Sequence, residues 1–204
     1  YAMINWAKDN GYTKFDPNTL AGCILMNPGR DVSLAMDVNN DGKYSVYNIP
    51  ARYFGLEKYE RTYQALEFQL EKPFDGKWGA FFSYVLSRSV GTAEGYVQSQ
   101  LNQEDAGITQ DFDFGSFTHG SKGYLPNDRR HVFKFFGNYA LTHEWRLGMN
   151  AILSSGRPYS CIGFVPKTVP DYAESSQYTS PSSYYCATST TTQTLVPRGS
   201  VGRT

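Results

Sequence analysis

Oxygen-bearing side chains recur in the stretch DVNNDGKYSVYN, residues 37–48, with the spacing of a calcium-binding loop. The residues at loop positions 1, 3, 5, 7, 9 and 12 are Asp37, Asn39, Asp41, Lys43, Ser45 and Asn48. Lys43 would offer its backbone carbonyl, Ser45 would bind directly or through water, and Gly42 supplies the sharp turn at position 6. Hard oxygen ligands at this spacing suit Ca²⁺, so the sequence predicts a calcium site.

Position 12 of this loop lowers the expected affinity for calcium. It holds Asn48 where tight sites have a bidentate glutamate, which predicts a dissociation constant of about 10⁻⁴–10⁻³ M. The helices that usually flank such a loop are not evident. The alternative interpretation is a polar turn, because Asp and Asn side chains readily bond to nearby backbone groups.

A second acidic cluster mixes carboxylates with aromatic rings, and it contains Glu104, Asp105, Asp111, Phe112, Asp113 and Phe114. The pattern is typical of a solvated loop with aromatic anchors, and a second cation site is the alternative. The three histidines have no metal-ligand spacing, and the chain has no nucleophile elbow, phosphate loop or HExxH motif. We therefore expect that the protein is not an enzyme.

Two of the three cysteines, Cys161 and Cys186, flank a segment rich in Ser, Thr, Tyr and Pro that is typical of an exposed loop. A Cys161–Cys186 disulfide would close this loop and would fit an oxidising compartment such as the periplasm or the cell surface. The alternative is that both remain free thiols, because sequence alone does not fix connectivity.

Composition narrows the class of protein. The 204-residue chain has 19 basic and 19 acidic residues, and this zero net charge argues against nucleic acid as a partner. Its 16 Tyr, 13 Phe and 3 Trp are abundant, yet no apolar run approaches the roughly 18–20 residues of a spanning helix. The composition remains compatible with a transmembrane barrel, because barrel strands alternate apolar and polar residues and therefore have no long apolar run.

Four segments, residues 61–71, 78–88, 131–141 and 145–156, alternate between apolar and polar positions. Such alternation predicts strands that lie between two environments. The polar positions that could line a wet interior are Glu67, Gln69, Glu71, Lys134, Asn138 and Asn150. Each segment has about eleven residues, near the 9–11 with which a tilted strand spans a bilayer.

The connections between these segments alternate in length. About five and about three residues join the two pairs, whereas roughly forty separate them, and such long loops are rare in compact soluble domains. Short turns on one side and long loops on the other are typical of outer-membrane barrels. Trp78 and Trp145 each begin a strand after a short turn, where an interfacial aromatic girdle would lie.

The stretch LPNDRRHVFKFFGNYALTHEWRLGMNAILSSGRPYSC resembles the C-terminal barrel region of Oar-like TonB-dependent outer-membrane receptors. The segments RTYQALEF, GTAEGYVQS, DAGITQDFDF and LVPRGSVGRT resemble the same family. This resemblance implies a 22-stranded barrel with a plug, energised by TonB, that imports an extracellular ligand across the outer membrane. Four strands cannot close a barrel, so we expect either that the chain is a fragment of a larger receptor, without the plug, or that other chains supply the remaining strands.

The run LVPRGS, residues 195–200, also equals a thrombin-cleavage linker used in protein expression. No histidine tag accompanies it, and VGRT continues as the next strand approach of the family would. We therefore interpret it as native sequence.

The predicted fold is all-β, with four long antiparallel strands of a transmembrane barrel. We expect residues 1–60 to form an extracellular loop region, 61–88 a barrel hairpin, 89–128 an extracellular loop, 129–156 a second hairpin, and 157–204 a loop that leads to the next strand. Outer-membrane lipid, TonB and an unknown extracellular ligand would be the partners. The alternatives are a secreted β-sandwich binding module with a calcium-stabilised loop, and a surface adhesion or export role on the same barrel.

Overall fold

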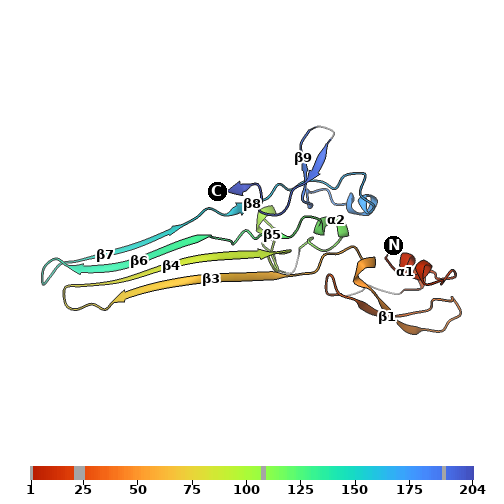
Figure 1. Ribbon diagram of the computed structural model, residues 1–204, viewed down its shortest axis with the longest axis horizontal. Helices are drawn as coiled ribbons and strands as arrows, with labels where there is room; N and C mark the ends of the chain where they lie inside the picture. Colours follow the sequence, from red (N-terminus) through yellow and green to blue (C-terminus); the bar gives the residue numbers. More distant parts are fainter. Residues whose placement is uncertain (1, 21–25, 107–108, 190–191) are drawn as a thin grey trace. The chain divides into compact units, whose positions relative to one another are not determined.

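A computed structural model describes residues 2–20, 26–106, 109–189 and 192–204 (Figure 1). The chain divides into two compact units. The loop unit contains Tyr1–Glu60, Thr109–Ser121 and Ile162–Leu195, and the sheet unit contains Arg61–Ile108, Lys122–Cys161 and Val196–Thr204. Cys23 lies outside the described residues.

The sheet unit is built on four long antiparallel strands in the order β3-β4-β6-β7 (Figure 1). These are β3 (Arg61–Lys72), β4 (Trp78–Gly91), β6 (His131–Ala140) and β7 (Arg146–Ser154). They occupy the four alternating segments, so the predicted strands and the all-β class are confirmed. β4 extends beyond the predicted end at residue 88, because Val90 and Gly91 pair with β5 (Gly123–Tyr124). No local sequence pattern predicts this pairing.

The strand register gathers the apolar positions on one face of this sheet. One row across the strands joins Phe68, Tyr84, Phe133 and Leu153, and a second joins Leu70, Phe82, Phe135 and Ala151. Because paired residues point to the same side, the rows form one continuous apolar face across all four strands.

The opposite face carries the polar side chains that the alternation predicted. One row across it joins Gln69, Ser83, Lys134 and Ile152. Glu67 lies on the same face and accepts a hydrogen bond from Gln69 Nε2 at 2.7 Å. The face is not uniformly polar, because rings such as those of Phe81 and Phe136 lie among the polar groups.

Side-chain capping of the backbone makes the turn between β3 and β4 tight. Asp75 Oδ1 accepts the backbone N–H groups of Lys77 and Trp78, each at 3.0 Å, and Lys72 Nζ lies 2.7 Å from Asp75 Oδ2. The hydrogen bond from Lys72, with these backbone donors, holds the pKa of Asp75 far below its ordinary value. Gly76 supplies the positive φ of 97° that the turn requires.

The sheet unit also contains shorter elements, two of which pair the chain after β7 with the last residues of the unit. β8 (Pro158–Tyr159) pairs antiparallel with β11 (Gly202–Arg203), and η3 (Ser99–Leu101) is a turn of 3₁₀ helix.

Thr142 Oγ1 caps the β6–β7 turn by accepting the N–H groups of Glu144 and Trp145, at 3.2 and 3.1 Å. Both hairpin turns are therefore short and are closed by their own side chains.

The loop unit has a small core of its own, which the sequence did not predict. Its elements are α1 (Ala2–Asp9), η1 (Pro17–Thr19), β1 (Val32–Met36), β2 (Ser45–Ile49), η2 (Ala51–Tyr53), α2 (Gly115–Thr118), α3 (Tyr172–Ser175), β9 (Tyr185–Ala187) and β10 (Gln193–Leu195). The antiparallel β1–β2 hairpin and α1 bury Trp6, Met36 and Ile49 together. Among the described residues, no helix is long and apolar enough to cross a membrane.

Candidate functional site

The apolar face of the β3-β4-β6-β7 sheet is a candidate functional surface. Leu66 on β3 is 70% exposed, and Leu153 on β7 is 68% exposed. Large apolar side chains at such exposure mark a surface that contacts something other than water. The other exposed apolar residues of this face on β3 and β7 are Phe68, Leu70, Leu147 and Met149.

Aromatic rings gather at the hairpin end of this surface. Trp78 and Tyr139 are cross-strand partners, and each is 42% exposed. Lys72 Nζ lies 4.1 Å from the Trp78 ring centre, which is a cation–π geometry, and Trp145 is 70% exposed. Amphipathic rings beside cations are typical of the interface between hydrocarbon and water.

The structure places the predicted calcium ligands around a turn between β1 and β2. Asp37 accepts the N–H groups of Asp41 and Gly42, at 3.1 and 2.7 Å, and Asp41 accepts the N–H of Lys43 at 3.0 Å. Ser45 and Asn48 belong to β2. Asn48 Nδ2 donates to Asp31 at 3.4 Å, so this side chain bonds outside the loop.

These hydrogen bonds set the charge state of Asp37. Burial raises the pKa of Asp37, but backbone N–H groups from Asp41, Gly42, Asn39 and Asn40 together lower it below its ordinary value. A lowered pKa stabilises the fold at pH values above the ordinary value, and that stabilisation is lost as the pH falls through the native value. The turn is therefore held by its own backbone at neutral pH, and calcium binding stays a prediction.

One member of the second acidic cluster, Asp113, has a side-chain partner in the structure. Asp113 accepts a hydrogen bond from Tyr178, which raises the pKa of Tyr178 to about 12, with burial adding to the effect. The bond therefore stabilises the fold up to about pH 10 and is lost as the pH rises toward 12. Across the described residues, no group of three or more His, Cys, Asp and Glu side chains is placed to hold a metal ion.

Cys161 and Cys186 are joined in a disulfide, which confirms the predicted pairing. Cys186 lies in β9, and the bond closes the segment whose Ser, Thr, Tyr and Pro content first indicated an exposed loop. A bond of this kind favours folding mainly by restricting the unfolded chain.

Replacing Cys161 and Cys186 by serine is expected to lower the free energy of unfolding by about 3.5 kcal/mol, the loop-closure value for a segment of this length. Urea unfolding followed by tryptophan fluorescence would measure the loss. Reductant should destabilise the wild-type protein by the same amount and leave the double variant unchanged. Equal stability of the wild-type protein with and without reductant would contradict the role given to this bond.

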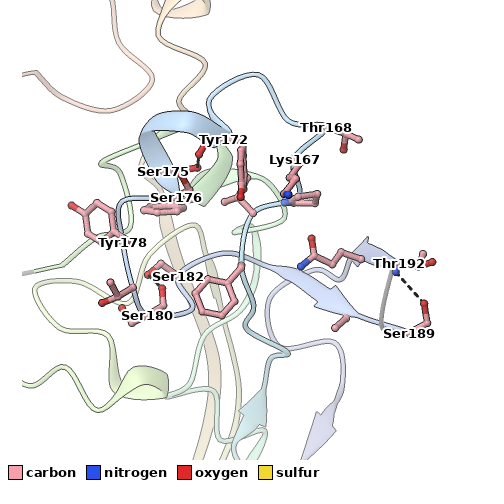
Figure 2. Close-up of a pocket in the computed structure, with 17 residues that line it drawn as sticks. Lys167, Thr168, Tyr172, Ser175, Ser176, Tyr178, Ser180, Ser182, Ser189 and Thr192 are labelled. Carbon is pink, nitrogen blue, oxygen red and sulfur yellow. Dashed lines mark hydrogen bonds between the residues drawn. The ribbon is translucent and has the colours of Figure 1, made fainter.

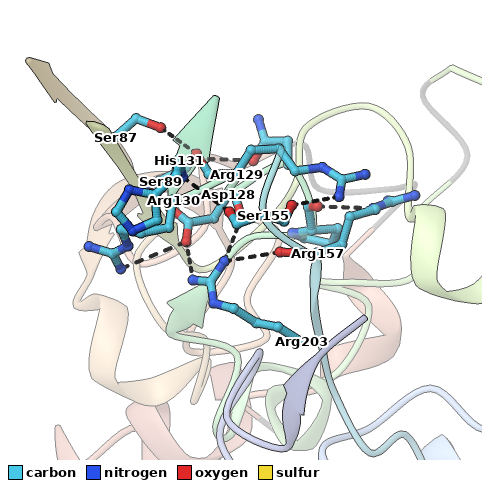
Figure 3. Close-up of polar contacts among 12 residues, drawn as sticks. Ser87, Ser89, Asp128, Arg129, Arg130, His131, Ser155, Arg157 and Arg203 are labelled. Carbon is cyan, nitrogen blue, oxygen red and sulfur yellow. Dashed lines mark hydrogen bonds and ion pairs between the residues drawn. The ribbon is translucent and has the colours of Figure 1, made fainter. Parts of the chain in front are cut away.

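A buried carboxylate organises the sheet unit at the end opposite the hairpin turns (Figure 3). Asp128 is 0% exposed, and its Oδ1 accepts the N–H of Ser89 at 2.5 Å. Its Oδ2 pairs with Arg203 Nη2, and Arg130 Nη2 lies 3.8 Å away. Arg203 Nη1 also donates to the carbonyls of Asp128 and Gly156, at 2.8 and 3.2 Å. Sequence reasoning missed this cluster, because its members are far apart in the chain.

The LVPRGS segment is an integral part of the fold. Arg198 is 1% exposed, and its Nη2 donates to the carbonyl of Thr92 at 3.1 Å. Gly199 has a φ of 65°, and its N–H donates to Ser160 Oγ at 2.8 Å. A Cβ on Gly123 would lie 2.0 Å from the Arg198 carbonyl oxygen, so the two backbones are closely packed. This packing supports the interpretation of the segment as native sequence.

A comparison with known proteins finds a similarity to a transporter. The chain is similar to the TonB-dependent transporter Oar of Myxococcus xanthus, with 31% identity over 107 residues. The matched region covers 50% of this chain and spans only 10% of that transporter. No protein-family model matches the chain, and no solved structure matches it. The similarity, together with the all-β fold, suggests a relationship with TonB-dependent transporters.

Proposed function

We propose that this chain forms part of the wall and surface loops of a TonB-dependent receptor that imports a scarce ligand across the bacterial outer membrane. The observation that carries the proposal is the continuous, exposed apolar face of the β3-β4-β6-β7 sheet. Hydrocarbon is the environment in which such a face is stable, and strands of 9 to 14 residues are long enough to cross it.

The two outer strands of the sheet also support this role. Among the described residues, β3 and β7 are at the edges of the sheet and have no further strand beside them. Unpaired strand edges are unstable in a membrane, so we propose that neighbouring strands of a closed barrel, of 22 strands in this receptor class, pair with both. TonB would act through a plug in the lumen.

The long connections take the cell-surface position in this proposal. Residues 1–60, 89–128 and 157–204 would form extracellular loop regions, and residues 61–88 and 129–156 would form the two barrel hairpins. The disulfide supports an oxidising location for residues 157–204. Binding by these loops, followed by rearrangement of the plug, would move the ligand inward.

Fractionation and uptake test this function. The receptor that contains this chain should be recovered with the outer membrane, should need detergent to remain dispersed, and should support ligand uptake only when TonB is present. A monodisperse, detergent-free protein would instead favour the secreted β-sandwich module. Outer-membrane localisation without any TonB-dependent uptake would favour adhesion or export on the same barrel.

Millimolar calcium is expected to slow proteolysis of the Asp37–Asn48 turn, because a bound ion would link carboxylates that now bond only to the backbone. Limited digestion with and without chelator measures the effect. The variant Asp41→Asn should reduce protection, since it removes one ligand charge, and Asp105→Asn in a separate exposed loop should not. Identical digestion patterns with calcium and with chelator would contradict calcium binding by this turn.

A further inference from the structure

A pocket of about 830 Å³ lies within the loop unit (Figure 2). Its walls come from α3 and the chain that follows it, from residues 164–168, and from the β9–β10 hairpin. The volume falls in the range of small-molecule sites in proteins. The proposed membrane wall makes no use of this pocket.

Hydroxyl groups dominate the rim of the pocket. Six of its exposed lining residues carry a hydroxyl group, namely Thr168, Ser176, Thr179, Ser180, Ser189 and Thr192. Figure 2 shows Ser176 and Ser180 on one side of the pocket and Ser189 and Thr192, from the β9–β10 hairpin, on the other. A hydroxyl can donate one hydrogen bond and accept others. Ser176 Oγ already donates to the carbonyl of Ala173 at 3.0 Å, but it can still accept, so this rim suits a ligand that is itself rich in hydroxyl groups.

Aromatic rings supply the apolar part of the lining. Phe117 is 2% exposed and forms part of the floor, whereas Phe164 is 50% exposed. Tyr172 lines the pocket from the first turn of α3. A sugar ring presents an apolar C–H face and a hydroxyl-bearing edge, which match an aromatic wall and a hydroxyl rim.

The charge of the lining limits the ligand class. Among the described lining residues, Lys167 is the only charged one, and no carboxylate is present. A polyanionic ligand would need several cations, and a free peptide would need a partner for its terminal ammonium group. A neutral ligand meets neither difficulty.

Two chain segments are bonded together around the pocket before any ligand arrives. Ser182 donates to Gln110, and the N–H of Ser116 donates to Asp171 Oδ2 at 2.9 Å. Tyr178 adds the hydrogen bond to Asp113 and packs edge-on against Phe117, with ring centres 5.5 Å apart. Such bonding reduces the entropy that a ligand must remove when it binds.

We propose that this pocket binds a neutral oligosaccharide. The inference rests on the proposed function in one respect, namely that it takes the pocket to be exposed at the cell surface. It names the ligand class for the loops, where the proposed function names only a scarce ligand.

Calorimetric titration of the purified protein in detergent tests the inference. The neutral probes are maltotriose, cellotriose and triacetylchitotriose, and the comparison probes are trigalacturonate and triserine. At least one neutral trisaccharide should bind saturably, and Phe164→Ala and Tyr172→Ala should each weaken it by about tenfold, because they remove the stacking surface. Lys167→Gln should change this affinity by less than about twofold, since a neutral ligand does not need the charge.

Tyr96→Ala is the matched control, because Tyr96 is an exposed tyrosine outside the pocket, and its affinity should equal that of the wild-type protein. Tighter binding of trigalacturonate or triserine, or binding of none of the probes by membrane-assembled protein, would overturn the sugar assignment and leave the membrane wall standing. Sugar binding by a protein that never enters the membrane would support the pocket and count against the receptor.

Discussion

Replacing Leu66 by arginine is expected to prevent assembly of the protein in the outer membrane. Leu66 lies midway along β3 on the apolar face, opposite Leu86 on β4, and is 70% exposed. A lipid-facing arginine near the bilayer midplane costs about 2–4 kcal/mol, which is a large part of the stability of a typical domain. The amount of heat-modifiable, membrane-integrated protein in outer-membrane fractions measures the effect.

Gln69→Arg is the matched control for this experiment. It introduces the same side chain on the same strand, but Gln69 lies on the polar face beside Glu67. Its assembly should be close to that of the wild-type protein, because a wet interior tolerates the charge. If Leu66→Arg assembles as well as Gln69→Arg, the apolar face does not meet lipid.

Asp128→Asn is expected to lower the free energy of unfolding by about 2 kcal/mol, because it weakens the hydrogen bonds that the buried carboxylate accepts from Ser89 and Arg203. Asp128 has no exposed surface, and its two oxygens bond to Ser89 and Arg203. Release of Arg203 should also free the β8–β11 pair, since Arg203 belongs to β11. Denaturant unfolding gives the global loss, and amide exchange at Gly202 reports the local release.

A double-variant cycle separates this ion pair from general damage. Asp128→Asn and Arg203→Gln should together cost clearly less than the sum of the two single changes, because each removes the same interaction. Asp105→Asn, at an exposed position, should change stability by less than about 0.5 kcal/mol. Additive costs for the two single variants would show that Asp128 and Arg203 act independently.

The strands of the sheet were predictable because each carries a dense local signal. Alternation over segments such as residues 61–71 has a period of two, and only an extended strand converts it into two distinct faces. The disulfide was predictable for a different reason, since Cys161 and Cys186 flank a loop-like composition. In both cases the informative residues are close together or define one segment.

The remaining features depend on contacts between distant residues. Asp128 and Arg203 are 75 positions apart, and the pocket is lined by α3, Phe117 and the β9–β10 hairpin. The small core around Trp6 and Met36 joins a short helix to a short hairpin, and neither is long enough to give a clear periodic pattern. The calcium motif is a local pattern, but its spacing alone did not predict that the Asn48 side chain contacts Asp31, 17 positions away.

The accessibility of successive β7 positions to oxygen and to a polar nickel complex tests the membrane-facing sheet most directly. Nitroxide labels would be placed from Gly148 to Leu153 in membrane-embedded protein, with Cys23→Ser to avoid side labelling. A membrane-facing sheet should give a period of two, in which Met149, Ala151 and Leu153 are exposed to oxygen and the positions between them to nickel. Low accessibility to both reagents at Met149, Ala151 and Leu153 would contradict it, because those side chains would then be buried within protein.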